Sequence, residues 1–177
     1  MWRLFVAVEV PRVTVAGIRE PRDASPMHVT LKFLGDVEEG RVSEIARALG
    51  EALSGTAGGP ATLQGVGVFP SAERPRVLWV GVGEGKSLLT RLGDQVENAL
   101  SGLGFPREDR PFHPHVTLAR IHDRRGADEA RRVLAENYGR LFAAFEIREV
   151  LLKRSVLAPG GAEHTTLVAI PLRAADA

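Results

Sequence analysis

The alternation of apolar and polar positions along the chain predicts seven strands and three helices. The strands are expected at 3–10, 27–35, 61–69, 76–82, 115–121, 145–159 and 163–172. The helices are expected at 39–54, 86–103 and 127–140, where apolar residues recur at helical spacing. The elements therefore follow one another in the order β-β-α-β-β-α-β-α-β-β.

Short turns between neighbouring strands predict antiparallel pairing, with the helices packed outside the sheets. The segment "PSAERP" separates 61–69 from 76–82, and Pro159, Gly160 and Gly161 separate the last two strands, which we expect to form a closing hairpin. The sequence contains no long linker and no low-complexity segment. We therefore expect residues 1–177 to form a single bilobal domain of the α/β class (α+β type), with two antiparallel sheets.

Two of the predicted strands carry the same four letters. "HVTL" occurs at 28–31 and again 87 residues later at 115–118, whereas random placement of the His and Thr residues gives about 0.2 His-x-Thr tripeptides in the whole chain. Side chains at i and i+2 of a strand share a face, so His28 lies beside Thr30 and His115 beside Thr117, with the intervening Val and Leu in the core. The spacing predicts two similar halves related by a pseudo-two-fold axis.

Two His-Thr pairs that face each other would suit phosphoryl chemistry without a metal. One imidazole can take a proton from the attacking oxygen while the other gives one to the leaving oxygen, each transfer typically contributing about 10²–10⁴-fold. The Thr hydroxyls can donate to the non-bridging phosphate oxygens. The alternative is that Thr and Val are good strand formers and each His is a partly buried edge residue.

The remaining histidines carry weaker signals. A third His-x-Thr begins at His164, but it follows His115 by only 49 residues and directly succeeds a Gly-Gly turn, so we expect it at a strand start near the rim of the site. His113 and His115 could be two metal ligands, yet no further ligand cluster accompanies them, and His122 is expected in a loop. Neither a GxGxxG nor a P-loop motif occurs, so we predict no metal and no cofactor.

Composition narrows the class of protein. Of 177 residues, 44% are hydrophobic and 25% charged, with a net charge of +1, which does not indicate binding to nucleic acid through bulk charge. The absence of cysteine excludes disulfides, thiolate zinc sites and a Cys nucleophile. No apolar run is long enough to cross a membrane, and "MWRLFVAVEVP" is interpreted as a strand, not a signal peptide. We expect a cytoplasmic monomer.

The ordered motifs resemble those of the 2H phosphoesterase superfamily, and more narrowly the RNA 2′,3′-cyclic phosphodiesterases, also called 2′-5′ RNA ligases. The resemblance covers most of the chain and is carried by "RLFVAV", "HVTLKFLG", "GVGVFP", "PRVLWVGV", "RPFHPHVTLAR" and "LLKRSVL". It implies a bilobal fold with antiparallel sheets lining a cleft. It also implies metal-independent opening of an RNA 2′,3′-cyclic phosphate to a 2′-phosphate, with 2′-5′ ligation as the reverse reaction, on RNA ends or nucleotides that bear the cyclic phosphate.

The resemblance also implies roles for individual residues. His28 would be the proton donor, His115 the proton acceptor, and Thr30 and Thr117 the oxygen-binding hydroxyls. Other substrate-binding candidates match family positions: Phe5, Arg76, Arg120 and Ser155.

Strand parity and two departures from the family pattern qualify these roles. By parity Lys32 shares the face of His28 and could assist an anion, whereas Arg120 falls on the face opposite His115. Residues 12–27 leave room only for a shortened helix, or for none, where the family usually has a full one. His164 stands about where the family commonly has a tyrosine, which affects contacts with the base.

Two other functions fit the same motifs. The first is a phosphodiesterase for a small cyclic nucleotide or an ADP-ribose cyclic phosphate. The second is a catalytically idle RNA-binding module, although 6% aromatic residues and a charge of +1 argue against avid binding of single-stranded RNA.

Overall fold

Two four-stranded antiparallel sheets organise residues 1–16, 26–159 and 161–175, the part of the chain that the computed structural model describes. The first sheet has the order β2-β1-β7-β8, formed by Trp2–Glu9 (β1), His28–Val37 (β2), Glu149–Ala158 (β7) and Gly161–Pro171 (β8). The second has the order β5-β4-β3-β6, formed by Gly59–Phe69 (β3), Val77–Val82 (β4), His115–Arg120 (β5) and Leu141–Ile147 (β6). The predicted fold class is confirmed.

The two sheets repeat one pattern. In each, a strand that begins with a His-x-Thr motif (β2 or β5) forms an edge and pairs antiparallel with the strand that precedes it in the chain (β1 or β4). The third strand of each sheet then pairs antiparallel with an opposite edge strand, β8 or β6. The sheets therefore correspond strand by strand, as the predicted pseudo-two-fold relation requires.

The prediction of one strand over 145–159 is wrong. The chain leaves the second sheet after Ile147, whose partner is Gly59, and enters the first sheet at Glu149, whose partner is Pro171. The linking residue Arg148 accepts a hydrogen bond at its carbonyl from the amide of Leu172, at 2.9 Å. No Gly or Pro marks this crossing between sheets, so the apolar pattern runs through it unbroken.

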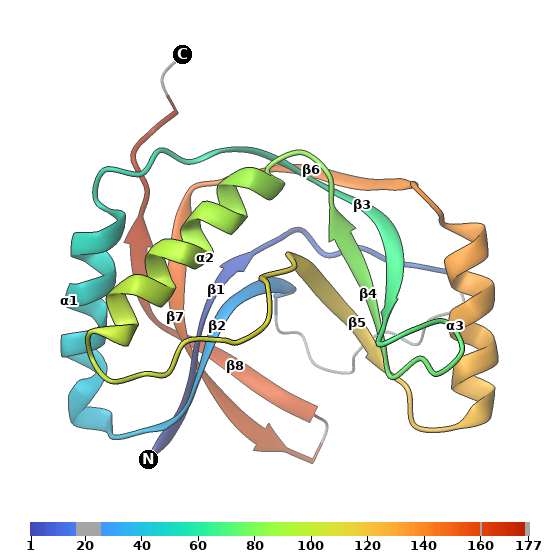
Figure 1. Ribbon diagram of the computed structural model, residues 1–177, viewed down its shortest axis with the longest axis horizontal. Helices are drawn as coiled ribbons and strands as arrows, with labels where there is room; N and C mark the ends of the chain where they lie inside the picture. The colour runs from blue at the N-terminus through green and yellow to red at the C-terminus, as the bar shows by residue number, and fades with distance from the viewer. Residues whose placement is uncertain (17–25, 160, 176–177) are drawn as a thin grey trace.

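The helices lie outside the sheets (Figure 1). A short 3₁₀ turn, Glu39–Arg41, leads into α1 (Val42–Leu53), and α1 packs with α2 (Lys86–Ser101) beside the first sheet, while α3 (Arg124–Glu136) packs against β3 of the second. α3 begins three residues before the predicted start because the Asp123 carboxylate accepts a hydrogen bond from the amide of Gly126 at 2.7 Å. No helix in the described ranges has the length and apolar character needed to cross a membrane.

The segment between β1 and β2 was expected to hold a shortened helix or none. Its described residues, 12–16 and 26–27, contain no helix, and residues 17–25 lie outside the described part of the chain. Val13 and Val15 are buried, and the amide of Val10 donates to the carbonyl of Met27 at 2.9 Å. These contacts fix the approach to the first motif.

A β-bulge follows the threonine in all three His-x-Thr strands. The extra residue is the next leucine in each case: Leu31 in β2, Leu118 in β5 and Leu167 in β8. A bulge bends its strand and increases the local twist. It also inverts the alternation of faces, so residues beyond each bulge point to the side opposite the one that simple parity predicts.

The bulge at Leu31 overturns the predicted position of Lys32. Beyond the bulge Lys32 pairs with Val6 and turns away from His28 toward α2. Its ammonium, in a side chain only 1% exposed, donates to both carboxylate oxygens of Glu97 at 2.8 and 2.9 Å and to the carbonyl of Pro106 at 2.7 Å. Lys32 therefore joins the first sheet to the segment that leads into β5, and it does not face the position expected for an anion.

Removing this ammonium should destabilise the fold. Lys32→Met leaves the Glu97 carboxylate largely buried without its partner, so we expect a loss of about 3 kcal/mol in the free energy of unfolding. Urea denaturation measures it. The control Arg47→Met breaks an ion pair whose side chains are 73% and 70% exposed and should lose less than about 0.5 kcal/mol. Equal losses in the two variants would contradict a structural role for Lys32.

Candidate active site

The first motif presents its histidine on a floor formed by Phe5. His28 pairs with Glu9 and Thr30 with Ala7, so both motif side chains share the face of β1 that carries Phe5. The ring of Phe5, only 2% exposed, lies 5.0 Å from the His28 ring between centroids. The Phe5 ring therefore packs against the imidazole of His28. The family resemblance predicts Phe5 only as a substrate-binding candidate.

The second motif is built on the other sheet in a related way. His115 pairs with Gly81 and Thr117 with Trp79. The ring of Phe69 from β3 lies 5.0 Å from the His115 ring, and the indole of Trp79 lies 6.1 Å from it. Trp79 covers Gly67 so closely that a Cβ there would fall 2.1 Å from the indole, so this aromatic floor requires glycine at that position.

Each motif histidine is oriented by a backbone carbonyl two residues upstream. The Nδ1 of His115 lies 2.7 Å from the carbonyl oxygen of His113, and the Nδ1 of His28 lies at the longer distance of 3.5 Å from that of Pro26. A carbonyl oxygen can only accept, so Nδ1 carries the proton in both bonds. Nε2 is then the nitrogen that is free to exchange a proton with a ligand.

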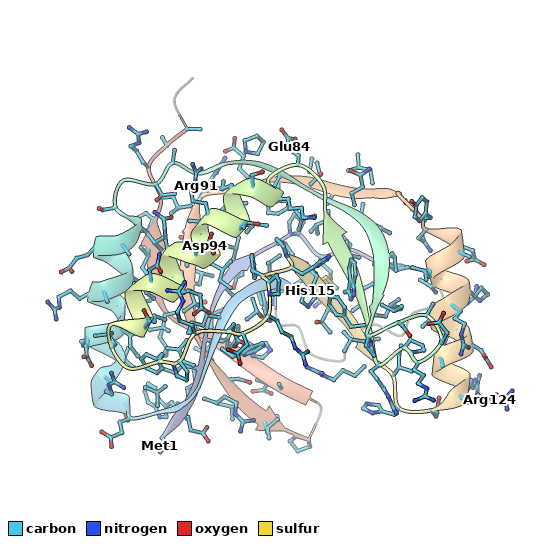
Figure 2. The ribbon with its side chains drawn as sticks, viewed as in Figure 1. Met1, Glu84, Arg91, Asp94, His115 and Arg124 are labelled. Carbon is cyan, nitrogen blue, oxygen red and sulfur yellow. The ribbon has the colours of Figure 1, made fainter. Side chains whose placement is uncertain are left out.

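The two motifs meet where the sheets adjoin. β2 and β5 are neighbours although they belong to different sheets, and Figure 1 shows them side by side at the centre of the molecule. His115 lies in this central region, between the two sheets (Figure 2). The structure thus brings together two motifs that are 87 residues apart in the sequence.

Burial and neighbouring positive charge make His28 a weak base. Its pKa falls from the usual 6.5 to about 4, first because the ring is desolvated, then because it lies near His164 and Lys153, while the Pro26 carbonyl and Glu9 act in the opposite direction. His28 is therefore neutral near pH 7 in the ligand-free protein. The pKa of His113 is also lowered, by burial and by the nearby charges of His115 and Lys86.

A buried lysine that the sequence pattern did not single out lies beside this histidine. Lys153, 1% exposed, donates to the Glu9 carboxylate and, at 3.1 Å, to the hydroxyl of Thr166. A compositional signal could have found it, because only three of the 23 basic residues are lysines. Two of those three, Lys32 and Lys153, are buried in ion pairs.

The bulge at Leu118 reverses the expectation for Arg120. Simple parity put this arginine opposite His115, but beyond the bulge it pairs with Val77, two residues before Trp79 on the face that also carries Thr117. Arg120 is exposed on the His115 side of the sheet. The same shift in β2 places Phe33, which pairs with Phe5 and is 64% exposed, on the His28 side.

The other predicted residues lie at different depths. Ser155 is half-buried and pairs with His164, so it shares the face of Phe5 and Lys153. Arg76 is exposed just before β4, where its amide donates to the carbonyl of Phe69 at 2.7 Å. Among the residues described, no three His, Asp or Glu side chains gather in an arrangement able to hold a metal ion.

Comparison with known proteins agrees with this architecture. The sequence model of the 2′-5′ RNA ligase superfamily matches residues 6–155. The chain belongs to this superfamily.

Curated relatives and a solved structure extend the similarity to nearly the whole chain. A protein of Aeropyrum pernix named RNA 2′,3′-cyclic phosphodiesterase is 39% identical over 142 residues, which cover 79% of this chain and 78% of the relative. An Archaeoglobus fulgidus protein of the same name is 35% identical over 173 residues, 90% of this chain and 94% of its own. The crystal structure of a Thermus thermophilus protein, TT0787, superposes with a TM-score of 0.72 at 27% identity, covering 97% of this chain and 98% of that structure.

The lowered pKa of His28 should appear in the pH dependence of stability of this superfamily member. As the pH falls below 6.5, His28 becomes protonated in the unfolded chain, but in the folded protein it becomes protonated only near pH 4. The free energy of unfolding should therefore fall on acidification from pH 6.5 to about pH 4. His28→Gln removes that contribution, and urea denaturation between pH 7 and pH 4 should show a smaller loss than in the wild type. The control is His122→Gln at an exposed position, which should follow the wild type. Identical pH profiles for His28→Gln and the wild type would contradict the shift.

Proposed function

We propose that this protein hydrolyses the 2′,3′-cyclic phosphate at RNA ends to a 2′-phosphate. The observation that carries the proposal is the pair of His-x-Thr strands, each with its histidine Nδ1 directed at a backbone carbonyl and its Nε2 left for proton transfer. Two such imidazoles supply the acid and the base that opening a cyclic phosphodiester requires. Relatives named RNA 2′,3′-cyclic phosphodiesterase support the choice of substrate.

In the proposed reaction His115 is the base. Its Nε2 takes a proton from a water molecule as the water oxygen forms a bond to phosphorus. The bond from phosphorus to the 3′-oxygen breaks, and that oxygen receives a proton from Nε2 of His28. Thr30 and Thr117 donate to the non-bridging oxygens, where negative charge accumulates. The product is a 2′-phosphate and a free 3′-hydroxyl.

The donor role of His28 has to be reconciled with its low pKa. A proton donor must be protonated, yet near neutrality the ligand-free His28 is neutral. The anionic cyclic phosphate favours the protonated imidazole, because an opposite charge nearby raises the pKa of a histidine. Bound substrate therefore brings His28 into its active protonation state.

Exposed residues beside each motif support an RNA end over a small cyclic nucleotide. Phe33 and Arg120 occupy equivalent positions beyond the two bulges, Phe33 on β2 and Arg120 on β5. An exposed aromatic ring can stack on an unpaired base, and a guanidinium can bind a phosphate. A chain longer than one nucleotide could use both.

The remaining expectations belong to the same proposal. One copy of residues 1–177 contributes both motifs, so the catalytic unit is a bilobal monomer. It acts without metal or cofactor through its own imidazoles. The lack of cysteine suits the reducing cytoplasm, where we place it.

A product assay tests the proposal. A cyclic-ended oligonucleotide and a 2′,3′-cyclic mononucleotide are supplied side by side with EDTA, and the position of the product phosphate is determined by nuclear magnetic resonance. We expect 2′-phosphate from both, with a higher kcat/KM for the oligonucleotide, and no stimulation by divalent ions. Loss of activity in EDTA with recovery on zinc or manganese would overturn the metal-free mechanism. A preference for the mononucleotide would favour the small-molecule alternative, and binding without turnover would favour the RNA-binding one.

The two histidines should act as a unit. His28→Ala and His115→Ala are each expected to lower kcat/KM by about 10²–10⁴-fold, and the double variant should be little worse than the worse single one. A phosphodiester with a p-nitrophenolate leaving group needs no proton donor, so it should partly rescue His28→Ala and leave His115→Ala inactive. The exposed His122→Ala serves as control. Rescue of His115→Ala instead would exchange the two roles.

A further inference from the structure

The third His-x-Thr motif lies in the same site as the first. His164 pairs with Ser155, and Thr166 pairs with Lys153, so both side chains share the face that carries Phe5 and His28. The sequence pattern predicted His164 near the rim of the site. The structure places its ring 5.1 Å from His28 between centroids, with the two planes at 90°.

The His28 ring is held between two aromatic neighbours. His164 packs edge-on against Phe5 at 5.0 Å and 76°, and Phe5 in turn lies 5.0 Å from His28. The strand that carries His164 is anchored next to the ring, because the hydroxyl of Thr166 accepts from the ammonium of Lys153 at 3.1 Å. Any movement of His164 therefore changes the space available to His28.

The charged groups around His28 come from four strands. β1 contributes Glu9, β7 contributes Lys153, and β8 contributes His164. His115 on β5 lies in the neighbouring sheet. Glu9 and Lys153 form an ion pair with each other, so their effects on the His28 ring largely oppose one another. His164 is the neighbouring imidazole on this sheet, and an imidazole can be neutral or positively charged.

We propose that His164 is a positioning residue that forms a coupled pair with His28 and controls when His28 carries a proton. Two imidazolium ions 5.1 Å apart repel each other strongly in a partly desolvated site, so the pair holds at most one proton through the working pH range. The protons then leave in two steps that belong to the pair and not to either ring. This inference deepens the proposed function, on which its catalytic meaning rests.

The pair gives the chain a property that a tyrosine at this position would not supply. A neutral ring could hold His28 in place, but it would not compete with it for a proton. With histidine, a positive charge on His164 opposes protonation of His28, so His28 takes up its proton only at a lower pH. We therefore expect the acidic limb of activity to depend on His164 even though this residue exchanges no proton with the substrate.

Direct titration of His28 tests the coupling without any substrate. Imidazole-labelled protein is followed by ¹⁵N nuclear magnetic resonance from pH 8 to pH 4, with His28→Gln used for assignment. In His164→Tyr, which keeps an aromatic ring and removes the charge, the His28 midpoint should rise by about one pH unit, with the acidic limb of kcat/KM moving the same way. The same substitution at exposed His122 should leave both unchanged.

Two further variants separate charge from packing. His164→Gln, a smaller neutral side chain, should raise the His28 midpoint as His164→Tyr does, and it serves as the test if tyrosine disturbs the fold. His164→Ala should raise the midpoint and also lower kcat, because the ring that holds His28 is lost. An unchanged midpoint in the folded Tyr and Gln variants would overturn the proposal. The titration needs no turnover, so it tests the coupling of His28 and His164 even if the hydrolysis assay fails. An active enzyme with an unchanged His28 midpoint would overturn the coupling and leave the proposed function standing.

Discussion

The bulge after each His-x-Thr motif is the constraint on which the site depends. Regular alternation places the motif histidine and threonine on one face, and the bulge then inverts the alternation, so that the next residues change sides. In β2 this sends Lys32 into the interior and Phe33 to the site, and in β5 it sends Ala119 inward and Arg120 to the site. The bulges at Leu31 and Leu118 therefore place the next residue in the interior and the following residue on the face that can reach a ligand.

The curl of the first sheet follows from the same irregularities. β2 and β8 are its opposite edges, and three strand spacings would separate them by about 14 Å in a flat sheet. Yet the rings of His28 and His164, carried by those edges, lie 5.1 Å apart. Bulges at Leu31 and Leu167 each bend an edge strand, and the Phe5 and His164 rings pack close to the His28 ring, whose pKa is lowered chiefly by burial.

The sequence predicts the two sheets, the three helices and the pair of motifs, because these depend on local periodicity and on repeated letters. It misplaces Lys32 and Arg120, since a bulge changes the face of a strand without changing its composition. It also merges β6 with β7, because an apolar run can pass from one sheet to another with no turn residue to mark the crossing. The ion pair of Glu9 with Lys153 and the ring contact of His28 with His164 each join strands that are more than 130 residues apart in the sequence, and strand pairing of that kind is invisible to periodicity.

The carbonyl that orients each motif histidine belongs to the backbone of the residue two positions upstream, and that residue is proline in one motif and histidine in the other. Since only the main-chain carbonyl accepts this hydrogen bond, the side chain at this position does not affect which tautomer forms. The backbone conformation therefore selects the tautomer of each imidazole. The residue type before the motif can vary while Nε2 remains the nitrogen that exchanges a proton.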